Sequence, residues 1–271
     1  MMFRETSDGP IAITQPSHAW LSGQIIRAWG NDEFGSVTPY EDVCLAAEQH
    51  DLGWQMWEQS PTRDPETGGP HSFRQLSVTA HIGIWSRGTA MALSLGRYPA
   101  LLISLHGTGL YANFDAAVAD AGDRAAVHAF LTEQQEIQRR LTARLRLDKH
   151  LGQLSGDDMI ERNRRLVRAA DRMSIAICTG MRDLAIRSDG PFEAKVKDVP
   201  TAVGETDLRL LAVGGDITNV VVTPWPFAEP RVRVSCEGIK LPPQRFNNDD
   251  EMRIALRNAT RLVLSTDLRR S

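Results

Sequence analysis

The chain has 271 residues, of which 42% are hydrophobic and 24% charged, and its net charge is −3. These values are typical of a globular protein and argue against a nucleic-acid-binding surface spread over the whole molecule. The first 15 residues contain no apolar signal core, and the longest aliphatic stretch, 100–105, is too short to cross a bilayer. Three cysteines lie far apart without a CxxC spacing, which favours a reduced, cytoplasmic protein.

Hydrophobic periodicity predicts a chain that is helical for about its first 190 residues. A hairpin around Gly9-Pro10 is expected over 1–14, before the first helix. Ser17 is the candidate N-cap of that helix. The predicted helices cover 18–29, 40–51, 73–87, 99–113, 124–147 and 157–186. The intervening stretch 59–71 is rich in Pro, Gly and Asp and is expected to be a loop.

The sequence pattern changes near Ser188-Asp189-Gly190-Pro191. Beyond this point, short segments of strand-like composition are separated by Gly and Pro. They predict strands over 208–213, 219–223, 231–236 and 261–265, and a helix over 249–258. We therefore expect a mainly α fold, with a helical body over 1–190 and a small β-rich (α+β) extension over 191–271 packed on it. The N-terminal hairpin could pair with this extension.

Six ionisable residues lie where five of the predicted helices should present apolar side chains. They are His18, His50, Asp51, His81, His106 and Asp171. Apolar residues at spacings of three, four and seven share their faces, which directs these side chains toward the core. A lone inward histidine is more often hydrogen-bonded than a ligand, and Arg168 could pair with Asp171 one turn later. Five helices that all direct imidazole or carboxylate inward nevertheless indicate a shared metal site.

Neutral imidazole and carboxylate are ligands that suit Fe, Mn, Zn or Ni. Six ligands exceed the needs of one four-coordinate ion, so we expect two ions, Fe or Mn being favoured over Zn or Ni. Asp51 could bridge them. Two ions a few ångströms apart can hold a hydroxide and polarise a phosphoryl group.

The order of these residues resembles the HD superfamily of metal-dependent phosphohydrolases. Members are helical, with ligands in the order His, His-Asp, Asp and two further histidines between in binuclear members. Six segments also look like an uncharacterised bacterial family with an HD-like core: ITQPSHAWLSG (13–23), AAEQHDLGW (46–54), PTRDPETGGPHSF (61–73), ALLISLHGTGLY (100–111), AADRMSIAIC (169–178) and VVTPWPF (221–227). The resemblance implies a binuclear cage, in which His81, whose surroundings match least distinctively, decides between one ion and two.

Four residues are candidates for catalysis: Asp51, Glu48, Arg168 and Gln15. Gln15 and Glu48 lie close in sequence to predicted ligands and could orient them or exchange protons. Arg164 and Arg168 share the face of Asp171 and could bind a substrate phosphate or carboxylate, the alternative being ion pairs with Glu or Asp. The loop 61–73 could be a lid over the metals or a rigid surface crossover.

Three functions fit these features. The first is a phosphohydrolase that cleaves phosphoesters or nucleotides with a metal-activated hydroxide. The second is an HD-type di-iron oxygenase that cleaves a C–C or C–P bond, and the third is a non-catalytic, metal-stabilised binding protein. We expect a small-molecule substrate that can be phosphorylated, no nucleic acid and no membrane association, and we leave a homodimer open.

Overall fold

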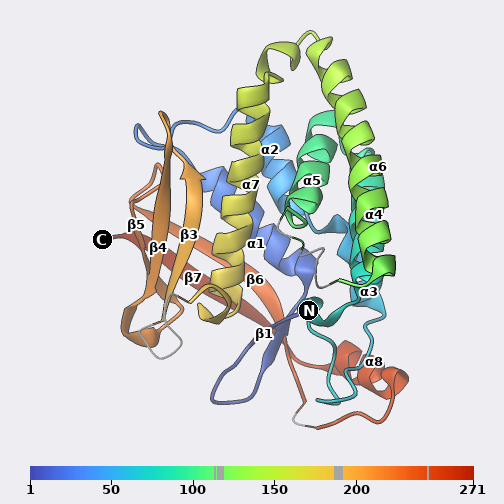
Figure 1. Cartoon of the computed structure of the whole chain (residues 1–271). Coiled ribbons are helices and arrows are strands. Elements are labelled where there is room, and N and C mark those ends of the chain that lie inside the picture. The colour runs from blue at the N-terminus through green and yellow to red at the C-terminus, as the bar shows by residue number, and fades with distance from the viewer. Residues whose placement is uncertain (113, 115–118, 186–191, 243) are drawn as a thin grey trace.

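A computed structural model describes residues 1–112, 114, 119–185, 192–242 and 244–271. A curled sheet lies on one side of the molecule and most helices on the other, with α7 (Asp157–Cys178) between them (Figure 1). The fold is therefore α+β, and the expectation of a mainly helical bundle with a small extension is wrong. The sheet is larger than expected because it recruits strands from both ends of the chain.

The sheet has seven strands in the order β1-β2-β6-β7-β5-β4-β3. Neighbouring strands are antiparallel except β5 and β7, which are parallel. The N-terminal hairpin forms as predicted, and its second strand pairs with β6 through Ala12 and Ile239. The strands are β1 (Met2–Arg4), β2 (Ile11–Ile13), β3 (Glu193–Pro200), β4 (Glu205–Ala212), β5 (Asn219–Thr223), β6 (Arg231–Lys240) and β7 (Arg261–Arg270).

We predict no strand from the sequence of 193–200, yet β3 forms there. Its inner face is made by Ala194 and Val196, which alternate with exposed lysines. A register shift before Val199 breaks this alternation after a few residues, and Asp198 has a positive φ of 58°. The period-two signal is therefore too short to stand out without knowledge of the neighbouring strand.

Most helices lie within a few residues of their predicted positions, but α4 (Val78–Ala92) begins and ends five residues after the predicted range 73–87, and α7 ends at Cys178, before the predicted end. Thr14, not Ser17, caps the first helix, because the Thr14 side chain accepts a hydrogen bond from the Ser17 backbone N–H. This first helix is α1 (Gln15–Ala28), and besides α4 and α7 the described α-helices are α2 (Tyr40–Gln49), α3 (Gln55–Gln59), α5 (Arg97–Gly109), α6 (Ala121–Arg146) and α8 (Asp249–Asn258). The predicted helix ends at 113 and 186, and the boundary at 190–191, lie outside the described residues.

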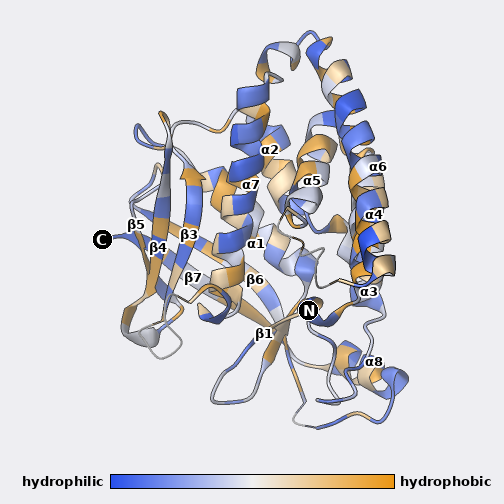
Figure 2. Ribbon diagram, in the orientation of Figure 1, coloured by the Kyte–Doolittle hydropathy of each residue, from blue (hydrophilic) through white to orange (hydrophobic). Residues whose placement is uncertain are grey.

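One hydrophobic core joins helices and sheet. It includes Leu21 of α1, Ile177 of α7, Val196 of β3 and Val234 of β6. Helices α6 and α7 alternate hydrophilic and hydrophobic residues along their lengths, as amphipathic helices do (Figure 2). None of the described helices is long and apolar enough to cross a membrane. Packing of α7 on β3 and of α1 on β6 places both helices firmly between the sheet and the remaining helices.

Candidate metal centre

Five of the six predicted ligands converge at one buried point. We call them the His/Asp cluster: His18 from α1, His50 and Asp51 after α2, His106 from α5 and Asp171 from α7. The His18 Nε2 atom lies 2.8 Å from Asp51 Oδ2 and 3.2 Å from His50 Nε2. The His50 Nε2 atom lies 3.3 Å from Asp171 Oδ1, and His106 Nε2 lies 3.8 Å from Asp171 Oδ2. Every member is at most 7% exposed.

The backbone at the end of α2 allows two neighbouring side chains to reach the same point. In a continuous helix, successive side chains diverge by about 100°. Asp51, however, leaves the helical conformation with φ −97° and ψ 19°. Because this His-Asp dipeptide lies at the end of a helix, both of its side chains can approach His18 and Asp171.

Two histidines have their second ring nitrogen occupied outside the cluster. His50 Nδ1 donates to the carbonyl oxygen of Ala47 at 2.8 Å. His18 Nδ1 lies 2.5 Å from Ser174 Oγ, whose own proton goes to the Asp171 carbonyl oxygen. Both Nδ1 atoms therefore act as donors, and both Nε2 atoms point into the cluster. Such outer hydrogen bonds fix the tautomer and orientation of metal-binding histidines.

Interactions within the cluster oppose the effect of burial on the pKa values of His50 and Asp171. Burial would lower the pKa of His50, but Asp51 and Asp171 outweigh it and raise that pKa to about 9. Burial likewise favours a protonated Asp171, yet the hydrogen bond from His50 and the electrostatic influence of the surrounding histidines hold its pKa well below the ordinary value. Burial lowers the pKa of His106 to about 4, so this imidazole is neutral. Without a metal, a proton on His50 is what compensates the two carboxylates.

The structure does not bring His81 into the cluster. Its Nε2 accepts a hydrogen bond from Trp85 Nε1 at 3.1 Å, and its Nδ1 lies 2.7 Å from the Tyr111 hydroxyl. The two groups of described residues whose ligand atoms are close enough to hold an ion do not include His81. Its ring instead contacts the rings of Trp54, Trp85 and Tyr111, which with His81 we call the aromatic wall. The ring centroids of His81 and Trp54 lie 5.6 Å apart. The wall reaches the cluster where the Trp85 ring lies 5.5 Å from that of His106.

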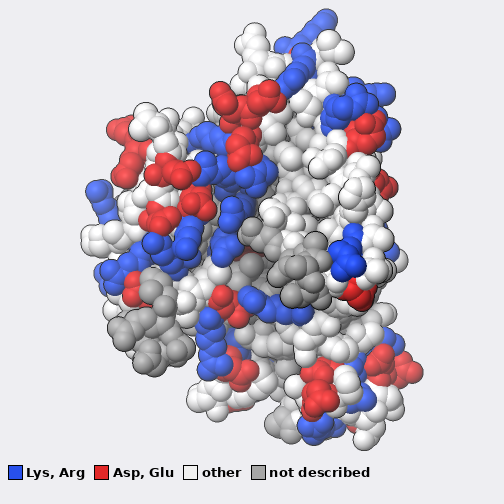
Figure 3. All heavy atoms as spheres, viewed as in Figure 1, with Lys and Arg blue, Asp and Glu red and all other residues white. Residues whose placement is uncertain are grey.

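Arg168 does not pair with Asp171, contrary to one alternative drawn from the sequence. The Asp171 oxygens face histidines, and Arg168 has no ion pair with any described residue. Burial and then Arg172 lower the pKa of Arg168. Arg164 differs, because it forms two hydrogen bonds with Glu161 at 2.6 and 2.7 Å. Figure 3 shows basic side chains gathered over α7 on this face of the molecule.

Gln15 and Glu48, both candidates for catalysis, have different surroundings. Gln15 lies one helical turn before His18 and is 5% exposed, and its Oε1 atom has no hydrogen-bond partner among the described residues. Glu48 is not brought to the cluster, because its Oε2 lies 3.0 Å from Arg27 Nη2 and its side chain crosses Gly23. Two residues before His50, the helix turns Glu48 by about 200° to another face.

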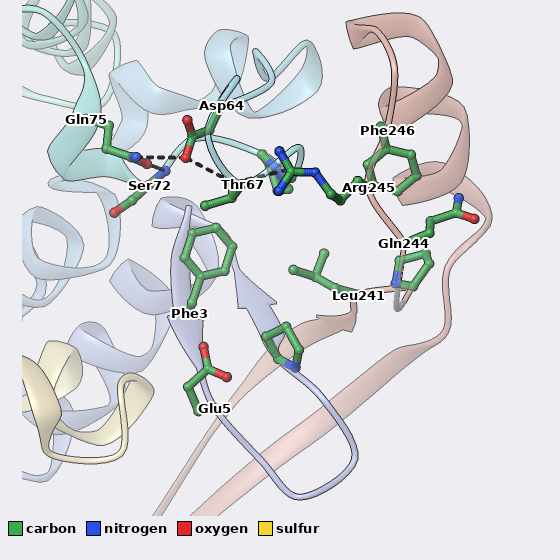
Figure 4. A pocket seen from close by; sticks show the side chains of 14 residues that line it. Phe3, Glu5, Asp64, Thr67, Ser72, Gln75, Leu241, Gln244, Arg245 and Phe246 are labelled. Atoms are coloured by element: carbon green, nitrogen blue, oxygen red, sulfur yellow. Dashed lines mark hydrogen bonds between the residues drawn. The ribbon is translucent and has the colours of Figure 1, made fainter.

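The loop 61–73 is bonded to the C-terminal segment. The Arg63 backbone N–H donates to Asp249 Oδ1 at 2.8 Å, and the Phe246 N–H donates to the Gly68 carbonyl oxygen at 3.0 Å. The loop lines a cavity together with Phe3 and residues 241, 242 and 244–246 (Figure 4). These bonds favour the rigid-crossover interpretation over a lid.

Two residues that matter here were not singled out from the sequence. Ser174 orients His18, and its spacing of three from Asp171 was the available signal. Trp85 engages His81 from one turn away, a contact that helical spacing alone does not distinguish from ordinary core packing.

The family described as a protein of unknown function, DUF3891, has a model that matches residues 1–243. Neither the curated proteins nor the solved structures give a match. Because the family match covers most of the chain, the protein belongs to the DUF3891 family.

Proposed function

We propose that the protein is a metal-dependent hydrolase of phosphoesters or nucleotides that uses the His/Asp cluster as its centre. The observation that carries this proposal is the convergence of three imidazoles and two carboxylates in a nearly solvent-free site. Two ionised carboxylates in a core are costly unless a cation compensates them. Their order along the chain resembles the ligand order of HD phosphohydrolases, which supports hydrolysis.

We propose one ion at this centre, not two. His50 Nε2 belongs to both candidate groups, His18–His50–Asp51 and His50–His106–Asp171. Its Nδ1 is already bonded to Ala47, so His50 can bind one ion only. The two groups therefore describe a single site, with His18, His50, Asp51 and Asp171 as ligands in HD order and His106 beside them.

The donor set suits a borderline transition metal such as Fe, Mn or Zn. When bound, such an ion supplies Lewis acidity toward a phosphoryl oxygen and lowers the pKa of water. The hydrogen bonds of His18 and His50 would keep both Nε2 lone pairs directed toward it. The ion would also replace the proton that His50 otherwise holds between Asp51 and Asp171.

Two further residues would act on the substrate. Arg168, one turn before Asp171 and without a carboxylate partner in the described chain, is suited to bind an anionic phosphoryl group. The unpartnered Oε1 of Gln15 would accept a hydrogen bond from the attacking water or a substrate hydroxyl. A buried amide oxygen without a donor costs roughly 1–3 kcal/mol, which a bound partner would recover.

The test is a panel of phosphomonoesters, phosphodiesters and nucleotides, with phosphate or alcohol release measured on protein loaded with Fe, Mn or Zn. We expect one ion per chain and turnover that His50→Ala abolishes, while the exposed control His128→Ala retains it. Arg168→Gln should raise KM by about tenfold or more, since it removes a charged contact, whereas Arg164→Gln has a smaller effect. Metal-loaded protein that hydrolyses no member of the panel would contradict the proposal.

The di-iron oxygenase alternative requires a second ion. With His81 bonded to Trp85 and Tyr111, the described residues offer too few remaining ligands for it. Iron content near two per chain together with substrate-dependent oxygen uptake would favour that alternative.

A further inference from the structure

A cavity lies outside the His/Asp cluster, at the junction of three segments. Its walls come from the β1–β2 hairpin, the loop 61–73 and residues 241, 242 and 244–246 before α8 (Figure 4). Its volume is about 590 Å³, within the range of sites that hold small molecules. None of its lining residues belongs to the cluster.

The body of the cavity is apolar. Phe3 stands on one side, and Leu241 and Phe246 stand on the other, with Pro10 and Pro70 completing the wall (Figure 4). Hydrogen bonds hold these walls in place: the Phe246 N–H donates to Gly68, and the Leu241 N–H donates to Pro10. The two phenylalanines therefore face a preformed space and need no folding of the segment on binding.

One end of the cavity carries an ionised carboxylate that forms no ion pair with any described residue. Asp64 is 3% exposed, and its oxygens accept hydrogen bonds from the Glu66 N–H, Thr67 Oγ1 and Gln75 Nε2. These donors, the backbone of Glu66 first, and to a lesser extent the nearby His71 lower the pKa of Asp64. All three donors are neutral, so the negative charge is stabilised but not cancelled.

The remaining charges make the cavity net negative. Glu5 lines it from the hairpin and has no ion pair among the described residues. Arg245 is the one cation in the described wall, and its Nη2 donates to the carbonyl oxygens of Pro65 and Glu66 at 3.3 and 2.7 Å. Its guanidinium is thus engaged by the loop backbone, while two carboxylates remain without a cation.

We propose that this cavity binds a small organic amine, with its apolar body between Phe3 and Phe246 and its ammonium group toward Asp64 or Glu5. An aromatic face attracts a cation, and an uncancelled carboxylate adds a charged hydrogen bond. A neutral ligand of the same shape gains the apolar contacts alone. An anion meets two like charges.

The test compares three probes of matched shape on the metal-loaded full chain: 2-phenylethylamine, 2-phenylethanol and 3-phenylpropionate. Ligand-observed NMR and calorimetry measure their binding. We expect the amine to bind about tenfold more tightly than the alcohol, as a charge-assisted contact implies, and the carboxylate to bind most weakly.

Glu5→Gln removes one exposed charge and should weaken amine binding up to about fivefold, the range of exposed ion pairs, without changing alcohol binding. Asp8→Asn, on the same hairpin but outside the cavity, is the matched control and should bind like the parent. Equal binding of amine and alcohol, preference for the carboxylate, or no binding of the amine at millimolar concentration would overturn the proposal. These outcomes do not depend on whether the protein hydrolyses phosphoesters.

Discussion

Trp85 Nε1 donates a hydrogen bond to His81 Nε2 at 3.1 Å, and this contact determines which ring nitrogen of His81 carries the proton. The indole N–H can only donate, so His81 Nε2 carries no proton and its Nδ1–H donates to the Tyr111 hydroxyl 2.7 Å away. A metal ion at Nε2 would have to displace the indole. His81, the residue that would decide between one ion and two, therefore has both ring nitrogens occupied by residues of the aromatic wall.

His81→Ala should leave the metal content at one ion per chain, because neither candidate group of ligands includes His81. His50→Ala should lose the ion, since His50 belongs to both groups. Elemental analysis of protein purified without added metal or chelator measures both. A parent with two ions that falls to one in His81→Ala would show that His81 is a ligand.

Ser174→Ala should weaken metal binding by roughly 10- to 100-fold, the usual effect of losing an outer hydrogen bond to a ligand. The substitution removes the acceptor of the His18 Nδ1 proton but leaves every ligand in place. Competition with a chromophoric chelator reports the affinity. Ser94→Ala, in the exposed turn after α4, is the control, and equal affinity of the two variants would argue that Ser174 does not orient His18.

The metal-free protein should lose stability as pH rises from about 6.5 to about 9. The His50 pKa is raised from 6.5 in the unfolded chain to about 9 in the fold, so the folded state binds the proton more tightly. Its stabilising contribution is complete below pH 6.5 and disappears as pH passes the folded value. Urea unfolding at a series of pH values measures this slope.

A saturating metal ion should remove that alkaline slope, because the ion replaces the proton between the carboxylates. His50→Gln, which cannot titrate, should lose it as well. An unchanged slope in His50→Gln would assign the pH dependence to another group.

Gly53→Ala should destabilise the fold by about 1–3 kcal/mol, the usual cost of overpacking. An added Cβ would lie 2.1 Å from the Ile84 carbonyl oxygen, so η1 (Leu52–Trp54) and α4 would have to separate. At Gly83, within α4, an added Cβ meets nothing within 4 Å, so Gly83→Ala should stabilise the fold by about 0.5–1 kcal/mol. Thermal unfolding of both variants checks the opposite signs.

Most helices and the inward direction of several His and Asp side chains could be predicted because they depend on local spacing. Helix α8 and strand β5 lie at their predicted bounds, and His18, His106 and Asp171 point inward as their apolar neighbours at three and four residues imply. Strand β3 was missed because its register shift hides the alternation. The fold class was wrong because strand pairing between residues 11–12 and 239–240 is a contact between distant segments.

The sequence by itself indicated the candidate site residues: the histidines and aspartates stand out against apolar faces, and their order needs no coordinates. Only the tertiary structure decided which of them meet. His81 and His106 both have apolar neighbours three and four residues away, yet Trp85 and Tyr111 engage both nitrogens of His81. Periodicity reports the direction of a side chain, whereas hydrogen-bond partners depend on where neighbouring helices bring theirs.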